Sequence, residues 1–208
     1  PQAYDPTIKW ETTLTYNVGV DYGFFNERLS GSVDVYMAET KDLLNSVQVP
    51  MGSGFGNKLM TNIGSIINSG VEIAISGVPV QKPDFSLQIG FNGTFQRTEF
   101  TKLNPTEDDN YYIEVGNISK GTGGYLCRQM VGYAPYTYYT YQQKYDSDGR
   151  PLQNEFVDRD NDGAITENDR YMTGKSAAPK FYYGMNMKLT YRNWDFGLNG
   201  HGAAGKIV

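Results

Sequence analysis

An almost unbroken alternation of apolar and polar residues runs from Trp10 to Phe24. Successive side chains of a β-strand point to opposite sides, so a period of two predicts a strand with one apolar and one polar face. The expected strand is fifteen residues long, whereas strands of soluble proteins average roughly five or six residues. A tilted strand needs about nine to eleven residues to cross a bilayer. The length of this segment is therefore typical of a membrane-spanning strand.

The same alternation recurs in five further segments, whose polar positions hold Glu, Asp, Lys, Gln and Asn. Such residues suit a water-filled lumen. Only half of each strand would face lipid, which explains why no apolar run of about eighteen residues appears. We expect strands at about 10–24, 28–44, 68–80, 84–100, 180–191 and 194–203.

The connections between these strands are of two kinds. Tight turns bordered by aromatic residues lie near Asn26, Pro83 and Asn193, while the linkers at about 45–68 and about 101–179 are long. Short turns at one end and long loops at the other are typical of outer-membrane barrels. A soluble β-sandwich also alternates, but its loops rarely reach the length of the second linker. We therefore expect three antiparallel hairpins that turn at one end, with an extracellular loop at 101–179.

The fold class that follows is all-β: antiparallel up-and-down strands that form a segment of a large transmembrane β-barrel with short periplasmic turns and long extracellular loops. Six strands cannot close such a barrel, because the smallest bacterial examples have eight. An open edge in lipid would leave main-chain groups without hydrogen bonds. Because the sequence also begins at Pro1 without a signal peptide, we expect residues 1–208 to be an internal part of one barrel domain in a longer polypeptide.

Charge and composition exclude several functions. The net charge is −5, and no basic stripe is present to neutralise phosphates, which argues against nucleic acid as a partner. The single Cys127 excludes an internal disulfide. The only histidine, His201, lies on the polar face of the last expected strand and has no Ser or Cys neighbour that would suggest a triad. We assign no catalytic residues and expect no enzymatic activity.

An Asp-rich segment at 158–169 matches the twelve-residue calcium loop position by position. Ca²⁺ prefers six to eight oxygen ligands, and a tight turn at Gly163 would direct alternate carboxylates to one point. The last position holds Asp in place of the usual Glu, which predicts a weaker site. The alternative is an Asp-rich turn without metal. The candidate Ca²⁺ ligands are Asp158, Asp160, Asp162, the Ala164 carbonyl, Thr166 and Asp169.

Nine of the seventeen tyrosines fall between Tyr111 and Tyr145. Tyrosine offers a flat apolar face and a hydroxyl group, which suit sugar rings and protein interfaces alike. Packing within the protein is the alternative, because some of these residues would be strand residues. The candidates for substrate or partner contact are Tyr133, Tyr136, Tyr138, Tyr139 and Tyr141.

Ordered motifs along nearly the whole chain resemble the C-terminal half of the SusC/RagA family of TonB-dependent outer-membrane transporters. They include Lys9-Trp10-Glu11, residues 16–21, residues 32–36 followed by 40–44, Asn62-Ile63-Gly64 with residues 68–72, residues 91–95, Val131-Gly132-Tyr133, the Asp-rich segment, and residues 179–184 with Trp194-Asp195-Phe196.

This resemblance implies a 22-stranded barrel with a plugged lumen, located in the outer membrane and in contact with its lipid. It also implies a SusD-like surface lipoprotein that captures the cargo, and TonB, which would act through parts of the parent protein outside this chain. The expected function is import of oligosaccharides. Import of peptides by the same class of transporter, or a soluble calcium-stabilised β-module for adhesion or glycan binding, are the alternatives.

Overall fold

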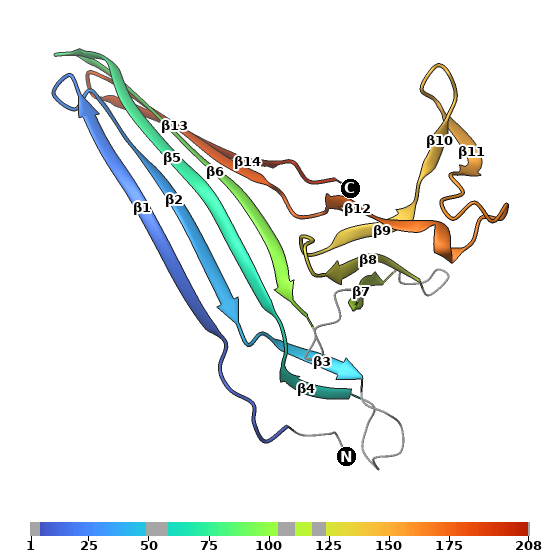
Figure 1. Cartoon of the computed structure of the whole chain (residues 1–208). Coiled ribbons are helices and arrows are strands. Elements are labelled where there is room, and N and C mark those ends of the chain that lie inside the picture. Colours follow the sequence, from blue (N-terminus) through green and yellow to red (C-terminus); the bar gives the residue numbers. More distant parts are fainter. Residues whose placement is uncertain (1–4, 49–57, 104–110, 118–123, 208) are drawn as a thin grey trace.

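The computed structural model of the protein describes residues 5–48, 58–103, 111–117 and 124–207. Six long strands form one antiparallel sheet in the order β1-β2-β5-β6-β13-β14 (Figure 1). The all-β, antiparallel prediction is thereby confirmed. The bounds are β1 (Thr12–Phe24), β2 (Leu29–Lys41), β5 (Ser65–Lys82), β6 (Phe85–Lys102), β13 (Phe181–Tyr191) and β14 (Trp194–Ala204).

The six strands are three hairpins whose tight turns lie at the same end of the sheet, at the upper left of Figure 1. The first turn uses three residues with positive φ, Phe25, Asn26 and Glu27. The second consists of Pro83 and Asp84, and the third contains Arg192, which has a φ of 51°. The expectation that the hairpins turn together near Asn26, Pro83 and Asn193 is confirmed.

The register aligns the apolar residues of neighbouring strands into continuous rows. Val18 pairs with Val35, Val35 with Val71, and Val71 with Phe95. One step along the strands, the polar residues form rows of their own, such as Asp34 beside Glu72. Because a one-residue slip would exchange the two faces, this register gives the whole sheet one apolar and one polar face.

The apolar face is the more exposed of the two. In β2, Val33 and Val35 are exposed, whereas the intervening Asp34 and Tyr36 are half-buried. Val20 is 65% exposed and Leu198 is 57% exposed. No layer of the described residues covers this face, which a β-sandwich would require. A soluble sheet buries its apolar side, so this inverted arrangement is that of a strand wall whose apolar face meets lipid.

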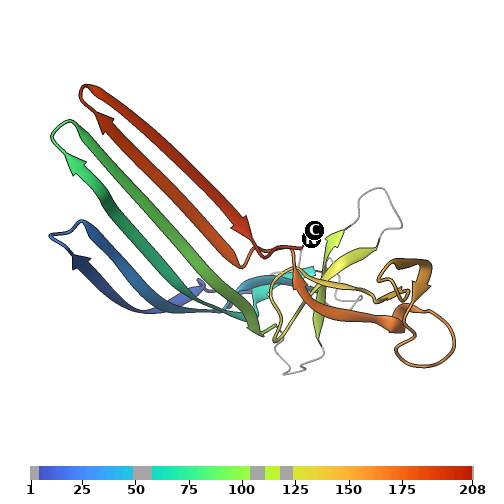
Figure 2. The ribbon, with the colours of Figure 1, turned by 90° about the horizontal axis from the view of Figure 1, so that it is seen from above.

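The segment expected as a long loop at 101–179 contains a second folded unit. Four short strands form a sheet in the order β12-β9-β8-β7, hereafter the loop sheet. Its strands are β7 (Tyr112–Asn117), β8 (Tyr125–Met130), β9 (Thr137–Tyr141) and β12 (Arg170–Ser176). A hairpin of β10 (Gln143–Tyr145) and β11 (Pro151–Phe156) and a 3₁₀ turn η1 (Glu167–Asp169) complete it. Figure 2 shows this unit beyond the ends of the three hairpins.

Two strand boundaries differ from those expected from the sequence. The strand expected at 28–44 ends at Lys41, because Asp42 adopts a φ of 60°. The chain then forms a separate hairpin of β3 (Leu44–Gln48) and β4 (Lys58–Asn62). The expected strand at 68–80 begins earlier, since pairing with β2 continues to Lys41 opposite Ser65. Alternation alone gave no signal for the positive φ that divides the first of these segments.

Few apolar side chains are buried in the part of the chain that the structure describes. They are Ile63, Phe100, Leu103 and Cys127. Main-chain hydrogen bonds join the two units, since Phe100 N donates to Tyr133 O (3.1 Å) and Gly132 N donates to Phe100 O (2.8 Å). Among the described residues, no helix is long and apolar enough to cross a membrane.

Candidate functional site

Three of the five candidate tyrosines serve the packing of the loop region. The Arg128 guanidinium lies 3.5 Å from the ring centroid of Tyr139, and that of Arg170 lies 4.6 Å from it. The Tyr138 hydroxyl donates to Ile207 O (2.9 Å), and the Tyr141 ring packs against Phe156. These three side chains are thus engaged within the protein.

Arg128 is the centre of this packing. Its guanidinium also lies 3.6 Å from the ring centroid of Tyr112, and its Nη2 atom is 3.3 Å from Glu114 Oε1. Cation–π contacts strengthen when they are shielded from water, and the Arg128 side chain is only 17% exposed. The tyrosine-rich composition of this segment is therefore explained in part by stacking between Arg and Tyr side chains inside the loop sheet.

Tyr133 and Tyr136 differ from the other three. Tyr136 is 51% exposed and has a φ of 56°, which is a strained conformation for a bulky residue. Tyr133 lies beside a pocket of about 460 Å³ at the junction of the two sheets. Tyr136 is thus exposed and Tyr133 lines the pocket, so these two are the candidates best placed to contact a ligand or partner.

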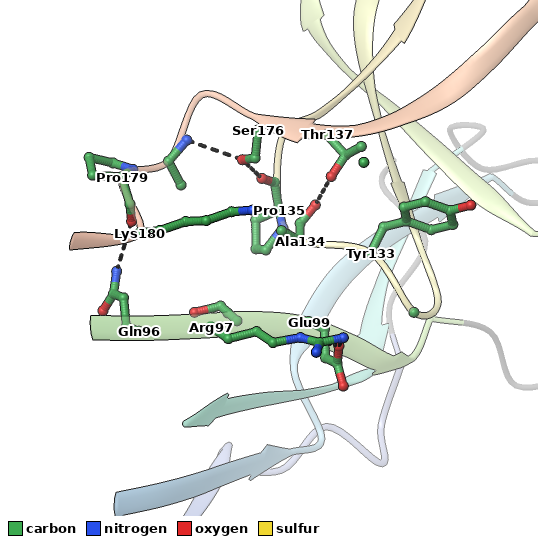
Figure 3. Close-up of a pocket in the computed structure, with 14 residues that line it drawn as sticks. Gln96, Arg97, Glu99, Tyr133, Ala134, Pro135, Thr137, Ser176, Pro179 and Lys180 are labelled. Carbon is green, nitrogen blue, oxygen red and sulfur yellow. Dashed lines mark hydrogen bonds and ion pairs between the residues drawn. The ribbon is translucent and has the colours of Figure 1, made fainter. Parts of the chain in front are cut away.

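The pocket lies between the end of β6 and two connecting segments of the loop region (Figure 3). Arg97 and Glu99 form an ion pair along the β6 side of the pocket, with Arg97 Nη2 2.7 Å from Glu99 Oε2. Lys180 extends from the start of β13 toward Pro135. The pocket is lined by residues 96–99, 132–135, Thr137, Gly174, Ser176 and 178–180.

Two buried hydroxyl groups fix the wall of the pocket opposite β6. The Thr137 hydroxyl donates to Ala134 O (2.7 Å), and the Ser176 hydroxyl donates to Pro135 O (2.6 Å). Both residues are almost fully buried. Sequence reasoning missed this pocket, because its walls come from three segments far apart in the chain, and no sequence pattern indicates that these segments meet.

The Asp-rich segment forms a compact loop, hereafter the Asp loop (residues 158–169). Carboxylate oxygens of Asp158, Asp160 and Asp162 all lie within 4.8 Å of one another. Because Ca²⁺–oxygen distances are about 2.3–2.6 Å, three oxygens at this spacing fit around one such ion. The turn is made by Asn161 and Gly163, which have φ values of 61° and 86°.

Asp169 has a role that the calcium pattern did not predict. It lies outside the group of three carboxylates, and it is fully buried. Its Oδ1 accepts a hydrogen bond from Arg159 N (2.6 Å), and its Oδ2 accepts one from Thr166 N (2.8 Å). The first bond joins the two ends of the loop, and the second is part of the capping box of η1. Thr166 in turn caps the η1 turn by accepting from Asn168 N, and Ala164 N donates to Asp162 Oδ1 (2.8 Å).

Local electrostatics differ between two of these carboxyl groups. Loss of hydration among the loop atoms raises the pKa of Asp160, and the charges of Asp162, Asp169 and Asp158 act in the same direction. The main-chain N–H groups of Thr166 and Arg159 lower the pKa of Asp169. The Asp loop thus holds a repelling carboxylate group at its tip and a stabilised carboxylate at its base.

Comparison with known proteins connects this architecture to a family. The family model described as TonB dependent receptor-like, beta-barrel, matches residues 1–205. TonB-dependent receptor SusC of Bacteroides thetaiotaomicron is 40% identical over 200 residues, which are 96% of this chain and 20% of that protein. TonB-dependent receptor P3 of Formosa agariphila is 31% identical over 209 residues, covering 92% of this chain and 20% of that protein.

Solved structures of the RagAB peptide transporter share the fold. One of them covers 97% of this chain and 22% of its own, with a TM-score of 0.75 at 23% sequence identity. The chain thus spans about a fifth of the length of the relatives that it matches. The family match extends over both the exposed apolar sheet and the loop sheet, so this chain belongs to the TonB-dependent receptor-like β-barrel family.

Proposed function

We propose that the parent protein is an outer-membrane importer of oligosaccharides that works with a SusD-like surface lipoprotein and is energised by TonB. Proteins of this family are outer-membrane β-barrels and are transporters, not enzymes, as expected from the lack of a catalytic motif. In this proposal the six long strands are part of the barrel wall, and the loop sheet lies on the extracellular side.

The exposed apolar face of the six-stranded sheet is the observation that carries the proposal. Val20, Val35 and Leu198 are each more than half exposed, while the opposite face carries Asp, Glu and Asn. A lipid environment stabilises the first face and a water-filled lumen stabilises the second. The soluble β-module is disfavoured because it would leave this apolar face in water.

The 40% identity to SusC over 96% of this chain supports a SusC-like transporter, and oligosaccharides are the cargo that the resemblance to the SusC/RagA family implies. The RagAB structures are those of a peptide transporter, so peptide import is the second candidate for this shared fold. Tyr133 and Tyr136, the accessible tyrosines, suit either cargo or a lipoprotein partner.

Deletion of the gene for the parent protein tests the cargo class. The deletion strain would be grown on oligosaccharides and, separately, on short peptides as sole nutrient, with a complemented strain as the control. We expect growth on at least one oligosaccharide to be lost and growth on peptides to be unchanged. Loss of growth on peptides alone would contradict the oligosaccharide assignment and favour the second candidate.

We further propose that the Asp loop binds Ca²⁺ through Asp158, Asp160 and Asp162, and that the ion stabilises the loop. The spacing of the three carboxylates supports this assignment. Loss of hydration, together with repulsion from the neighbouring carboxylates, raises the pKa of Asp160, and a cation would relieve that repulsion. The Ala164 carbonyl and Thr166 are the remaining candidate ligands. The ion would hold the loop in shape and take no part in transport.

A further inference from the structure

The main-chain ladder on one side of β6 is interrupted at Thr98. Gln96 N donates to Lys180 O (2.9 Å) on this side, and Phe100 N donates to Tyr133 O (3.1 Å). Alternate residues of an antiparallel strand direct both of their main-chain groups to the same side. Thr98, which lies midway, therefore directs its N–H and C=O groups to this side as well.

The chain that would pair with Thr98 turns away at this point. Continuing the register from Gln96 and Lys180 would place Ala178 opposite Thr98. Pro179 has no N–H group to support a strand, and Ala178 N donates instead to the Ser176 hydroxyl (3.1 Å). Within the described part of the chain, no main-chain hydrogen bond reaches Thr98 from this side.

The open pair of Thr98 groups faces the pocket at the junction of the sheets. Ala134, Pro135, Ala178 and Pro179 give this pocket apolar walls. Charged groups surround them, because the Arg97–Glu99 ion pair and the Lys180 side chain lie on the β6 and β13 sides (Figure 3). The pocket thus combines one peptide-like donor and acceptor pair, a small apolar surface, and several polar side chains.

The size of the gap limits what can occupy it. Gln96 and Phe100 are four positions apart along the strand, a distance of roughly 13 Å, and Lys180 and Tyr133 occupy the two ends of this gap. An extended peptide running along β6 is too long for this space. A single secondary amide fits: its C=O accepts from Thr98 N–H, and its N–H donates to Thr98 C=O.

We propose that this pocket binds an N-acetylated amino sugar through its acetamido group. The acetamido methyl would contact the alanine and proline walls, and the ring hydroxyls would reach Arg97, Glu99 and Lys180. The inference rests on the proposed function, because it specifies which oligosaccharides the importer selects. It adds a recognition element made by the main chain, which no sequence motif reveals.

Binding of N-acetylglucosamine to the purified full-length transporter tests this proposal, with saturation-transfer NMR and titration as readouts. Glucosamine and glucose are matched probes that lack the acetyl group. We expect the acetyl methyl protons to receive the strongest saturation, and the two matched sugars to bind at least tenfold more weakly.

Two variants of the full-length protein link this binding to Thr98. Thr98→Pro removes the N–H donor on the side of β6 that has no strand partner, where proline is tolerated, and should weaken N-acetylglucosamine binding about tenfold. Thr98→Ala retains the donor and should bind like the parent. A third variant, Ala134→Leu, narrows the pocket without altering β6 and should abolish binding. Heat-modifiable electrophoretic migration checks that the barrel of each variant is folded.

Three results would overturn the inference: equal binding of N-acetylglucosamine and glucose, no binding of N-acetylglucosamine, or equal binding by the Thr98→Pro and Thr98→Ala variants. None of them would contradict oligosaccharide import itself. N-acetylalanine methylamide, which presents an amide without a sugar, is the last probe. Binding of this compound as tight as that of N-acetylglucosamine would refute sugar recognition. Loss of growth on peptides alone, in the deletion strain, would instead refute the proposed function itself.

Discussion

Individual tyrosines of the loop region have different roles, although the sequence presents them as one cluster. Tyr139 contacts two guanidinium groups, while Tyr136 is half-exposed. From the sequence, each of these tyrosines could either pack within the protein or contact a substrate or partner. It could not separate the two groups, because the contacts of Tyr139 depend on Arg128 and Arg170, which lie on neighbouring strands.

Replacing Tyr139 with Leu removes the ring against which Arg128 and Arg170 pack. Shielded cation–π contacts contribute up to about 2 kcal/mol, so the loop sheet should lose about 1–2 kcal/mol of stability. Tyr139→Phe keeps the ring and should be nearly neutral. The stability of the loop sheet in each variant is measured by the rate of limited proteolysis at residues 124–145 in the full-length protein, with Tyr136→Leu as a control. Equal sensitivity at Tyr136 and Tyr139 would contradict the packing role.

Asp169 and Asp162 should respond differently to the loss of charge. Asp169→Asn leaves at most one acceptor for the N–H groups of Arg159 and Thr166, so the Asp loop should open whether or not calcium is present. Asp162→Asn keeps an acceptor for Ala164 N and should change only the calcium dependence. Cleavage within the loop, measured with calcium and with chelator, distinguishes the two. Identical patterns for both variants would show that Asp169 has no separate closing role.

At the scale of elements, the hairpins were predictable and the loop sheet was not. Apolar and polar residues alternate clearly in β1, in β13 and in residues 85–95 of β6, so the period of two is explicit there. The strands of the loop sheet have at most seven residues and lie among Gly, Asn and Tyr without alternation. Their pairing depends on contacts between distant segments, and the pocket beside Thr98 arises from the same contacts.

The two faces of a long strand should tolerate charge to different extents. Arginine in place of Val20 or Ile89 should cost the assembled barrel roughly 2–4 kcal/mol near the bilayer midplane, because the guanidinium would enter lipid. The same change at Asn17 or Gln88, on the polar face, should be mild. Urea titration of the full-length protein folded in lipid vesicles gives the free energies of unfolding. Similar losses on both faces would refute the lumen assignment.

Calcium removal should affect one element alone. Without the ion, repulsion among Asp158, Asp160 and Asp162 loosens the Asp loop, while the hydrogen bonds of the long strands are unaffected. Cleavage between Leu152 and Gly174 should rise sharply in chelator, and the unfolding of the barrel should not shift. An unchanged cleavage pattern would contradict calcium binding and would show that the Asp loop is an Asp-rich turn without metal.

At the scale of the whole molecule, the six-stranded sheet is open at β1 and β14. Unpaired strand edges are unfavourable in lipid, so in a barrel wall both edges would need neighbouring strands. The chain spans about a fifth of the length of the relatives that it matches. The ordered sequence motifs that resemble the SusC/RagA family are sufficient to predict this barrel architecture from the sequence.

Selective labelling of a single introduced cysteine is practical in this protein. Cys127 is buried, and burial raises the pKa of its thiol. A protonated, inaccessible thiol reacts slowly, so a nitroxide label attaches to the introduced cysteine. Positions along β2 are suitable, because this strand has a paired neighbour on each side.

The accessibility of such labels in the full-length protein in lipid vesicles tests the central claim, that the apolar face of this sheet contacts the bilayer. Labels at Val33 and Val35 should collide mainly with oxygen, which concentrates in lipid, while labels at Asp34 and Tyr36 should collide mainly with a water-soluble nickel chelate. An alternation of this kind would place the sheet in a barrel wall. Labels at Val33 and Val35 that are shielded from both reagents would show that protein covers this face, and would contradict the account.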